Sequence, residues 1–353
     1  MSVLDLARAD IRVLQPYASA RMEAGVGEVW LNANESALAP YGDRGAGCHR
    51  YPEPQPATLV AALGELYGAS VDQLLLTRGS DDGIDLLVRA FCRAGEDAIL
   101  VQVPTFGMYA VSARIQGAGV VAVPLARDFS LDVDAVLGAV TPAVKLVFVC
   151  APNNPSGQGV ERSALLQLAD ALADRALLVV DEAYVEFADD TSATALLARY
   201  PHLVVLRTLS KAWALAGARI GSVLAGSQVI NLLRRILPPY PLPRPCVDAA
   251  LRALSMAGQA NARQRIAEVC AQRAQVASSL RRFAAVREVL PSQANFLTVR
   301  FHHASAAHRR LLDAGVVVRD VSRYPRLDDA LRITIGTPAE NARMLDVLQE
   351  LAA

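Results

Sequence analysis

The stretch KLVFVCAPNNP, residues 145–155, contains an uninterrupted apolar run that ends at a Pro-Asn-Asn-Pro turn. A second stretch, ALLVVDEAY at residues 176–184, repeats this arrangement, with two carboxylates directly after the apolar run. A short continuous apolar run bounded by such signals indicates a strand that is buried on both faces. The fold class therefore depends on how many such strands the chain contains and on what lies between them.

Four further runs of the same kind occur, at residues 73–77, 98–101, 120–123 and 203–206. The segments between them carry apolar residues at helical spacing, as in residues 84–91. Strands that alternate with helices predict a mostly parallel sheet covered by helices on both faces. The expected fold class is therefore α/β, with this sheet in a large domain.

The composition changes after the last of these strands, which indicates a second, smaller α+β domain. The proline-rich residues 238–245 forbid regular structure, and residues 246 to about 283 have the composition of one long helix. Short strands at 295–299, 316–319 and 331–335 and two short helices are expected beyond it. The predicted parts are an N-terminal segment packed against the small domain (1–45), the large domain (46–240) and the small domain (241–353).

The composition argues against several classes of function. The chain has 35 Lys plus Arg and 35 Asp plus Glu, so its zero net charge does not favour nucleic acid or a membrane surface as a partner. No apolar run approaches the roughly 20 residues of a membrane span, and no signal-peptide pattern is visible. The five cysteines are scattered, which favours reduced thiols in a cytoplasmic protein, and no metal site is expected.

The residues that follow the predicted strands carry the chemistry, because ligands of doubly wound sheets bind just outside the carboxyl ends of the strands. These residues supply hydroxyl, amide, aromatic and carboxylate groups and one amine. They are Gly79-Ser80-Asp81, Thr105-Phe106, Asn153-Asn154, Asp181 to Tyr184, and Thr208 to Lys211. No G-x-G-x-x-G or P-loop motif occurs, so dinucleotide-dependent and P-loop functions lose their main support.

Lys211 is unusual because the chain has only one other lysine, Lys145, among its 35 cationic residues. Arginine holds its proton too tightly to act as a nucleophile, whereas a desolvated lysine amine can deprotonate and attack a carbonyl. A lysine, a carboxylate, a phosphate cradle and a flat aromatic side chain at one edge are what pyridoxal phosphate requires. Lys145, at the start of a strand, is expected to be a surface residue.

The chain resembles the fold type I, aspartate-aminotransferase-like pyridoxal-phosphate enzymes, and within them the histidinol-phosphate aminotransferase family. The resemblance covers nearly the whole chain in the family's order. It runs through LQPYASAR, LNANES, RYPEPQP, TRGSDDGIDLL, VPTFGMYAVSA, APNNPSGQ, VVDEAYVEF, TLSKAWALAGARIG, SQANF and LRITIGT. The sequence departs from the family at Ser156, often threonine, at Phe106, often tyrosine, and at Ser36-Ala37, commonly Asn-Pro.

The resemblance implies a role for each residue around pyridoxal 5'-phosphate. Lys211 would form a Schiff base with the aldehyde and move the substrate's α-proton, and Asp181 would pair with the pyridinium nitrogen. Asn154 and Tyr184 would hydrogen-bond the phenolic oxygen, and Phe106 would stack on the ring. Lys211, Asp181 and Tyr184 would thus be the catalytic residues. The phosphate group would be bound by Gly79, Ser80, Asp81, Thr208, Ser210 and Arg219.

The resemblance also implies amino transfer between L-histidinol phosphate and 2-oxoglutarate (giving glutamate) in histidine biosynthesis. This substrate carries a phosphate ester where usual substrates carry an α-carboxylate, so additional donors are needed. They would be Tyr17, Asn34, Tyr51, Asn154, Arg319 and Arg332. In this family the Tyr51 position reaches the partner's active site, which implies a homodimer.

Three alternatives remain at this stage. The first is an aromatic or broad-range amino acid aminotransferase, and the second is a threonine-phosphate decarboxylase of the same fold. The third is a non-catalytic sensor that keeps the fold and the cofactor. A sensor of transcription would need a DNA-binding module, which we do not expect here, and the retained Lys211 and Asp181 favour an enzyme.

Overall fold

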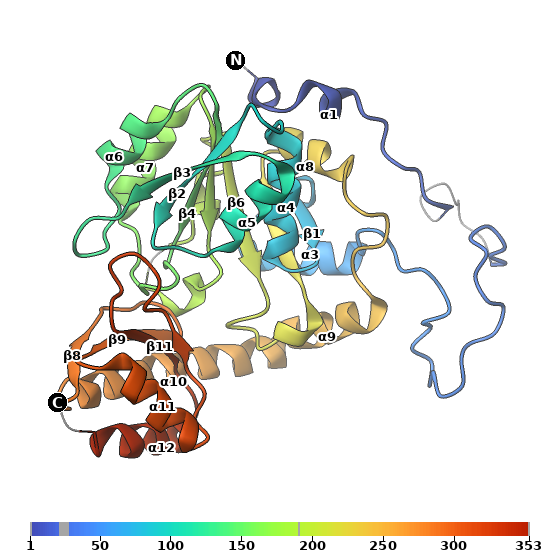
Figure 1. Cartoon of the computed structure of the whole chain (residues 1–353). Helices are drawn as coiled ribbons and strands as arrows, with labels where there is room; N and C mark the ends of the chain where they lie inside the picture. Colours follow the sequence, from blue (N-terminus) through green and yellow to red (C-terminus); the bar gives the residue numbers. More distant parts are fainter. Residues whose placement is uncertain (1, 21–27, 190, 352–353) are drawn as a thin grey trace.

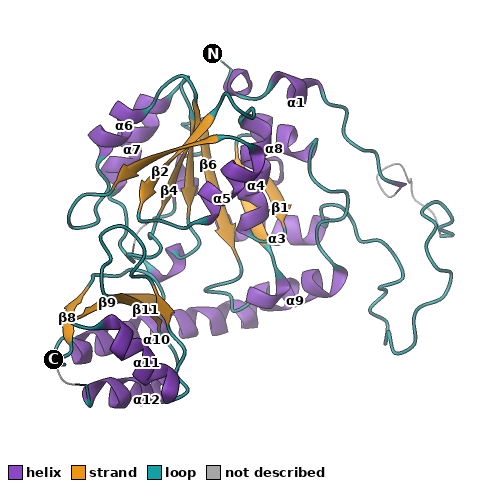
Figure 2. Ribbon diagram, in the orientation of Figure 1, coloured by secondary structure: helices purple, strands orange, loops and turns teal. Residues whose placement is uncertain are grey.

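The computed structural model describes residues 2–20, 28–189 and 191–351. Figure 1 shows a large domain around a sheet, a smaller domain that contains the C-terminal end of the chain, and a stretch of chain after the first helices that extends away from both. The large sheet lies between layers of helices, and the smaller sheet has helices packed beside it (Figure 2). This architecture is the α/β fold with a smaller α+β unit that the sequence predicts.

The large domain contains a seven-stranded sheet with the order β1-β7-β6-β5-β4-β2-β3. Its strands are β1 (Leu74–Thr77), β2 (Ala98–Val103), β3 (Gly119–Pro124), β4 (Val144–Cys150), β5 (Leu177–Asp181), β6 (Leu203–Thr208) and β7 (Gly221–Ala225). Strands β6, β5, β4, β2 and β3 pair in parallel, whereas β7 is antiparallel to both β1 and β6. The six predicted strands are confirmed, and β7 is an addition to the prediction.

Helices cover both faces of this sheet because the side chains of each strand alternate between two cores. In β4, Leu146 and Phe148 lie in one core, and Val147 and Val149 lie in the other. The core of Val147 and Val149 includes α3 (Ala57–Tyr67), α6 (Val133–Ala139) and α7 (Arg162–Leu172). The opposite core includes α4 (Ser80–Phe91), α5 (Met108–Gln116) and α8 (Ser227–Arg234). Burial on both faces explains why the strands read as continuous apolar runs.

The small domain is built on a four-stranded antiparallel sheet with the order β10-β11-β9-β8. Its elements are β8 (Val286–Val289), β9 (Phe296–Phe301), α11 (Ala304–Asp313), β10 (Arg319–Asp320), β11 (Ala330–Thr334) and α12 (Pro338–Gln349). The α+β unit is confirmed, with β8 as an additional strand. The strand predicted at 316–319 begins only at Arg319. Val316 and Val318 lie before this strand, and they pack as partly buried residues against the core of this domain.

The long helix predicted from 246 to about 283 is in fact two helices, α9 (Arg244–Leu254) and α10 (Met256–Leu280). Ser255 between them has an extended backbone with ψ of 160°, and its Oγ accepts a hydrogen bond from the Gly258 N–H at 3.2 Å, which caps α10. Helix α9 packs on α3 of the large domain, whereas the C-terminal turns of α10 lie in the small-domain core. The composition predicts that all of 241–353 belongs to the small domain, but α9 packs with the large domain.

The start of the chain packs against the large domain, so the expected packing against the small domain is wrong for these residues. Two short helices begin the chain, η1 (Val3–Leu6) and α1 (Ala9–Val13). Val3 and Leu6 join the core that contains α4 and α8, and the Arg8 N–H donates to the Ala90 carbonyl at 3.0 Å. Described residues 28–55 then follow as an irregular segment that extends from the large domain (Figure 1). Residues 1 and 21–27 of the predicted N-terminal segment lie outside the described residues.

None of the helices in the described residues is both long and apolar enough to cross a membrane.

Candidate active site

A cavity of about 510 Å³ lies at the carboxyl ends of the parallel strands and is bordered by residues of the small domain. Because β7 runs antiparallel, its first residues lie at this same edge, and they bring Arg219 to the cavity. Predicted site residues that line it are Ser80, Asp81, Phe106, Asn154, Asp181, Tyr184, Thr208, Ser210, Lys211, Arg219, Arg319 and Arg332. The structure thus brings together residues from five strand ends and from the small domain.

One wall of the cavity is a candidate anion site at the beginning of α4. The first N–H groups of an α-helix lack partners within the helix and attract anions, and the N-cap residue here, Gly79, offers no side chain to satisfy them. Thr208 Oγ1 donates to Ser210 Oγ at 3.0 Å. Arg219 donates to Ser210 Oγ at 3.4 Å and to the Asp81 carboxylate at 3.1 Å. A helix N-terminus with two hydroxyls and a guanidinium fits a phosphate group.

The close approach of β7 to this turn requires glycine. A Cβ at Gly221 would lie 2.3 Å from the carbonyl carbon of Gly79 and 2.5 Å from the nitrogen of Ser80. A Cβ at Gly79 would lie 2.5 Å from Nη2 of Arg219, and the φ of 80° at Gly79 lies in the region that favours glycine. Gly79 could be predicted from the sequence but Gly221 could not, because the contact exists only once β7 lies beside β1.

Asp181 forms the floor of the cavity at the end of β5 and is buried. Its Oδ1 accepts a hydrogen bond from the Ala183 N–H at 3.1 Å, and its Oδ2 accepts one from the Tyr109 hydroxyl at 2.7 Å. Burial raises the pKa of Asp181 from 3.8 to about 6, although both hydrogen bonds act in the opposite direction. A buried carboxylate is costly unless it meets a cation, so this position suits a protonated ring nitrogen.

Lys211 lies after β6, and its side chain is accessible from the cavity. Its Nζ lies 5.7 Å from the centre of the Tyr184 ring. Loss of hydration and, next, the Arg332 guanidinium lower the pKa of Lys211 below its ordinary value. A lower pKa increases the fraction of free amine, and free amine is the form that attacks a carbonyl.

The other walls near Lys211 are aromatic and amide side chains. Phe106 stands edge-on to Tyr109, with ring centres 5.6 Å apart. Burial raises the pKa of Tyr184, so its hydroxyl stays protonated and is able to donate a hydrogen bond. Asn154 Oδ1 accepts a hydrogen bond from Arg332 at 2.5 Å, which connects the two domains across the cavity.

Asn153 shapes the loop after β4, whereas its neighbour Asn154 lines the cavity. Asn153 Nδ2 donates to the Pro104 carbonyl at 3.0 Å and to Ser156 Oγ at 2.8 Å, and its Oδ1 accepts from Thr105 Oγ1 at 3.0 Å. Ser156 stands where the family often has threonine, and it supplies the hydroxyl that this loop uses. The departure from the family pattern therefore leaves the loop's hydrogen bonding intact.

Two arginines of the small domain face the cavity from adjacent strands. Arg319 in β10 and Arg332 in β11 are direct register partners, and both line the cavity. Like charges opposite each other on neighbouring strands repel. The pair is therefore suited to a bound anion, which would offset the repulsion.

Three residues predicted to bind substrate do not line the cavity of their own chain. Tyr17 is 71% exposed and Tyr51 is 49% exposed. The Tyr51 ring stacks on Tyr240, with ring centres 4.4 Å apart. Asn34 lies with Tyr51 beside a different hollow of about 400 Å³. A single chain therefore does not assemble the whole set of predicted substrate residues.

The structure also places residues at the site that the sequence analysis does not assign. Tyr109 contacts Asp181, while Cys150 and Tyr324 line the cavity. The signal that could have indicated Tyr109 is its place in the stretch VPTFGMYAVSA, three residues after Phe106. Tyr324 lies in the loop between β10 and β11, where no motif marks it.

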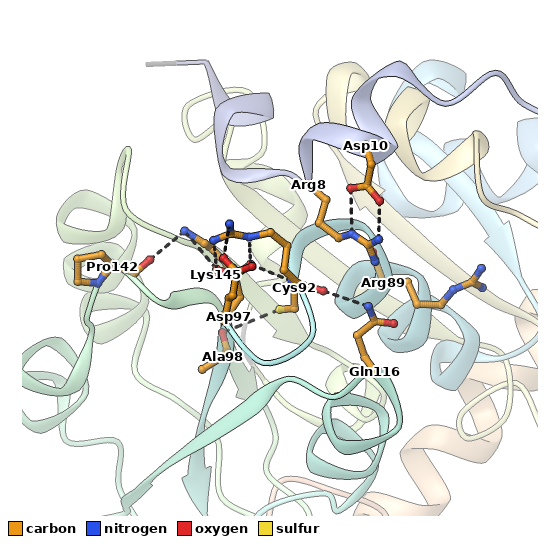
Figure 3. Close-up of polar contacts among 11 residues, drawn as sticks. Arg8, Asp10, Arg89, Cys92, Asp97, Ala98, Gln116, Pro142 and Lys145 are labelled. Atoms are coloured by element: carbon orange, nitrogen blue, oxygen red, sulfur yellow. Dashed lines mark hydrogen bonds and ion pairs between the residues drawn. The ribbon is translucent and has the colours of Figure 1, made fainter.

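Lys145 has a structural role at the opposite end of the sheet (Figure 3). Its Nζ donates to the Pro142 carbonyl at 2.8 Å and lies 3.8 Å from the Asp97 carboxylate. Arg93 donates to the same carboxylate at 2.8 Å, and the two cations keep the pKa of Asp97 below its ordinary value in spite of burial. Lys145 is half-buried and paired, so it is more constrained than the surface residue that was expected.

The fold and the site together define a class of protein. A parallel sheet with a lysine, a buried carboxylate and a candidate anion site at its carboxyl edge is the arrangement that a pyridoxal-phosphate-dependent enzyme requires. The profile of the family "Aminotransferase class I and II" matches residues 25–348. The chain belongs to this family, on its histidinol-phosphate aminotransferase branch.

The similar proteins span almost the whole chain. The histidinol-phosphate aminotransferase of Xanthomonas euvesicatoria is 53% identical over 352 residues, covering 99% of this chain and 97% of the relative. That of Xylella fastidiosa is 52% identical over 356 residues, covering 100% and 98%. The crystal structure of histidinol-phosphate aminotransferase from Sinorhizobium meliloti in complex with pyridoxal-5'-phosphate aligns with a TM-score of 0.79 at 28% identity, covering 90% of this chain and 89% of that chain.

Proposed function

We propose that this protein is an aminotransferase that uses pyridoxal 5'-phosphate to move the amino group between L-histidinol phosphate and 2-oxoglutarate. Relatives of this name that are more than half identical support the assignment. The structural observation that carries it is the pair Arg319 and Arg332 in register on one wall of the lysine cavity. When bound, the cofactor supplies a ring that accepts electrons from the substrate's α-carbon.

The residues present fit this cofactor. Lys211 offers an accessible amine with a lowered pKa, which also allows its Nζ to take up and return a proton. Asp181 offers a buried anion for the ring nitrogen, and Tyr184 offers a protonated hydroxyl. The N-terminus of α4 and Arg219 offer donors for the phosphate group. These residues are complementary to the charges of the cofactor. Asp181 would meet its protonated ring nitrogen on one wall of the cavity, and Arg219 with the α4 N-terminus would meet its phosphate group on another.

Arg319 and Arg332 are assigned to the phosphate ester of the substrate. A dianion between two guanidinium groups offsets their repulsion and accepts charge-assisted, bidentate hydrogen bonds. Arg332 also donates to Asn154, which we assign to the phenolic oxygen of the cofactor. Occupation of the phosphate site is therefore linked to the orientation of a cofactor-binding side chain.

We also propose a homodimer in which the partner chain contributes Tyr51 to the substrate site. The N-terminal segment exposes several apolar side chains. They include Val29 (79% exposed), Leu31 (87%) and Leu38 (79%). Apolar side chains exposed together indicate a protein interface.

A cytoplasmic location is also proposed for this protein, because its five cysteines are all free thiols.

The test compares kcat/KM for L-histidinol phosphate and for L-histidinol. Two or three charge-assisted hydrogen bonds of about 1.5–3 kcal/mol each favour the phosphorylated donor by on the order of 10³-fold. Arg332→Ala is expected to lose most of this preference. Arg310→Ala, which removes only an exposed ion pair with Glu350 on the same domain, is expected to keep it.

Two results would change the assignment. Equal use of both donors by the wild-type protein would contradict the phosphate site and favour a broad-range aminotransferase. Release of carbon dioxide from threonine phosphate, without amino transfer, would favour a decarboxylase.

A further inference from the structure

We propose that Tyr109 is a positioning residue for the cofactor, whose hydroxyl holds the Asp181 carboxylate ionised and oriented for the ring nitrogen. This inference rests on the role proposed for Asp181. The Tyr109 hydroxyl donates to Asp181 Oδ2 at 2.7 Å, and both side chains are buried.

Tyr109 lies outside the cavity, behind Asp181, and influences the cavity through that residue. It lies in α5, it is fully buried, and it is not among the residues that line the cavity. Its ring stacks on Phe148 with centres 4.7 Å apart and meets the Phe106 ring edge-on at 5.6 Å. These ring contacts fix the direction of the hydroxyl, so that Tyr109 reaches the cofactor site through Asp181 and through Phe106.

The hydrogen bonds of Asp181 leave room for a third partner. Oδ1 accepts from the Ala183 N–H and Oδ2 accepts from Tyr109. Each carboxylate oxygen accepts up to two hydrogen bonds, so a lone pair remains for a protonated ring nitrogen. Protonation of Asp181 would turn one oxygen from an acceptor into a donor and remove the anion that this nitrogen needs.

The charged surroundings make the hydroxyl necessary. The ionisable groups that act on Asp181 in addition to Tyr109 are Asp81, Glu182, Cys150, Tyr184 and Lys211. The two neighbouring carboxylates and burial all favour the neutral acid. A hydrogen bond donated to the carboxylate favours the ionised form. Burial and the Asp181 charge raise the pKa of Tyr109 well above its ordinary value, so Tyr109 remains a donor.

Tyr109→Phe tests the hydroxyl alone, because it keeps the ring that packs on Phe106 and Phe148. The matched control is Tyr200→Phe, since the Tyr200 hydroxyl donates to Asp170 Oδ1 at the same 2.7 Å on a different part of the large domain. The measured quantity is the dissociation constant of pyridoxal 5'-phosphate, titrated into each cofactor-free protein from pH 6 to pH 8.5. This readout is independent of turnover.

Loss of one charge-assisted hydrogen bond is expected to weaken cofactor binding about 10- to 100-fold in Tyr109→Phe. The loss should grow as the pH falls, because the pKa of Asp181 rises without its donor and less of the carboxylate is ionised. Tyr200→Phe should bind within about twofold of wild type, since its hydrogen bond has no route to the cavity.

A double-mutant cycle with Asp181→Asn separates the possible outcomes. If Tyr109 acts through Asp181, Tyr109→Phe has no further effect in the Asp181→Asn protein. An equal effect in both backgrounds would overturn the proposal, because the Tyr109 hydroxyl would then act independently of the Asp181 carboxylate. Unchanged affinity in Tyr109→Phe, with weaker binding in Asp181→Asn, would also overturn it. Unchanged affinity in Asp181→Asn would instead refute the role proposed for Asp181 itself.

Discussion

A residue that is placed to bind a ligand can lower the free energy of unfolding when no ligand is bound, and Asp181 is the clearest example at this cavity. Its side chain is buried at the end of β5, and burial raises its pKa from 3.8 to about 6. The folded state therefore binds this proton more tightly than the unfolded state does. Proton binding by Asp181 therefore increases the free energy of unfolding at low pH. This contribution is complete below pH 3.8 and is lost as the pH rises through about 6.

This difference in pKa predicts how the unfolding free energy of the cofactor-free protein depends on pH. The pKa of Asp181 is about 2 higher in the folded than in the unfolded state, so the free energy of unfolding should fall by about 3 kcal/mol between pH 4 and pH 7. Asp181→Asn removes the titrating group, so the wild-type unfolding free energy should fall relative to the variant over this range. Denaturant unfolding of both proteins at several pH values measures the difference. A constant difference would show that the pKa of Asp181 is the same in the folded and unfolded states, which would contradict the effect of burial.

The residues of the site divide into those that sequence predicts and those that it does not. Lys211, Asp181 and Asn154 could be predicted because each directly follows a strand, and strand ends meet at one edge of a parallel sheet. Tyr324 could not, because it reaches the cavity from a loop of the small domain without a motif. Tyr109 is intermediate, since it lies three residues after Phe106 in the sequence but its contact with Asp181 depends on how α5 packs.

Among the elements, β7 has the largest effect on the site, although the sequence does not reveal it as a strand. The six predicted strands are continuous apolar runs with turn signals, whereas Gly221–Ala225 is a short run that begins at the last residue of the stretch TLSKAWALAGARIG. Its antiparallel direction places its first residue, and not its last, at the edge where the parallel strands end. Arg219 reaches the candidate anion site for this reason.

The contact between β7 and the turn before α4 predicts a sharp effect for Gly221→Ala. The added Cβ would lie 2.3 Å from the backbone of Gly79, so the turn that presents the helix N-terminus must shift. Cofactor affinity should fall at least about tenfold, and the unfolding free energy should fall by about 1–3 kcal/mol. Gly226→Ala, just after the other end of β7, is the control, because its Cβ would come no closer than 3.7 Å to the Pro201 carbonyl. Similar effects in both variants would argue against a specific role for Gly221.

For the whole molecule, the sequence predicts the α/β architecture of the large domain and the α+β architecture of the small domain. It does not predict against which domain the connecting helix and the N-terminal residues pack. Apolar periodicity identifies which residues are buried, and it does not identify which neighbour buries them. Helix α9 and residues 2–14 both pack on the large domain, although composition associates them with the small one. The break at Ser255 has the same origin, since one serine in an alanine-rich stretch is not distinguishable as an N-cap without its hydrogen bond.

The proposed dimer makes a prediction that concerns the whole molecule, because it places residues of one active site on two chains. Tyr51→Ala and Lys211→Ala should each inactivate the homodimer, the first partially and the second completely. In a hybrid dimer, one active site would then combine Lys211 of the Tyr51→Ala chain with Tyr51 of the Lys211→Ala chain. Random mixing produces about half hybrid dimers with one intact site each, so about one quarter of wild-type activity should return. The measurement is amino transfer by the two chains after joint refolding, compared with each variant refolded alone. If Tyr51 acted within its own chain, every site in the mixture would retain one substitution, and no activity would return beyond the sum of the two variants.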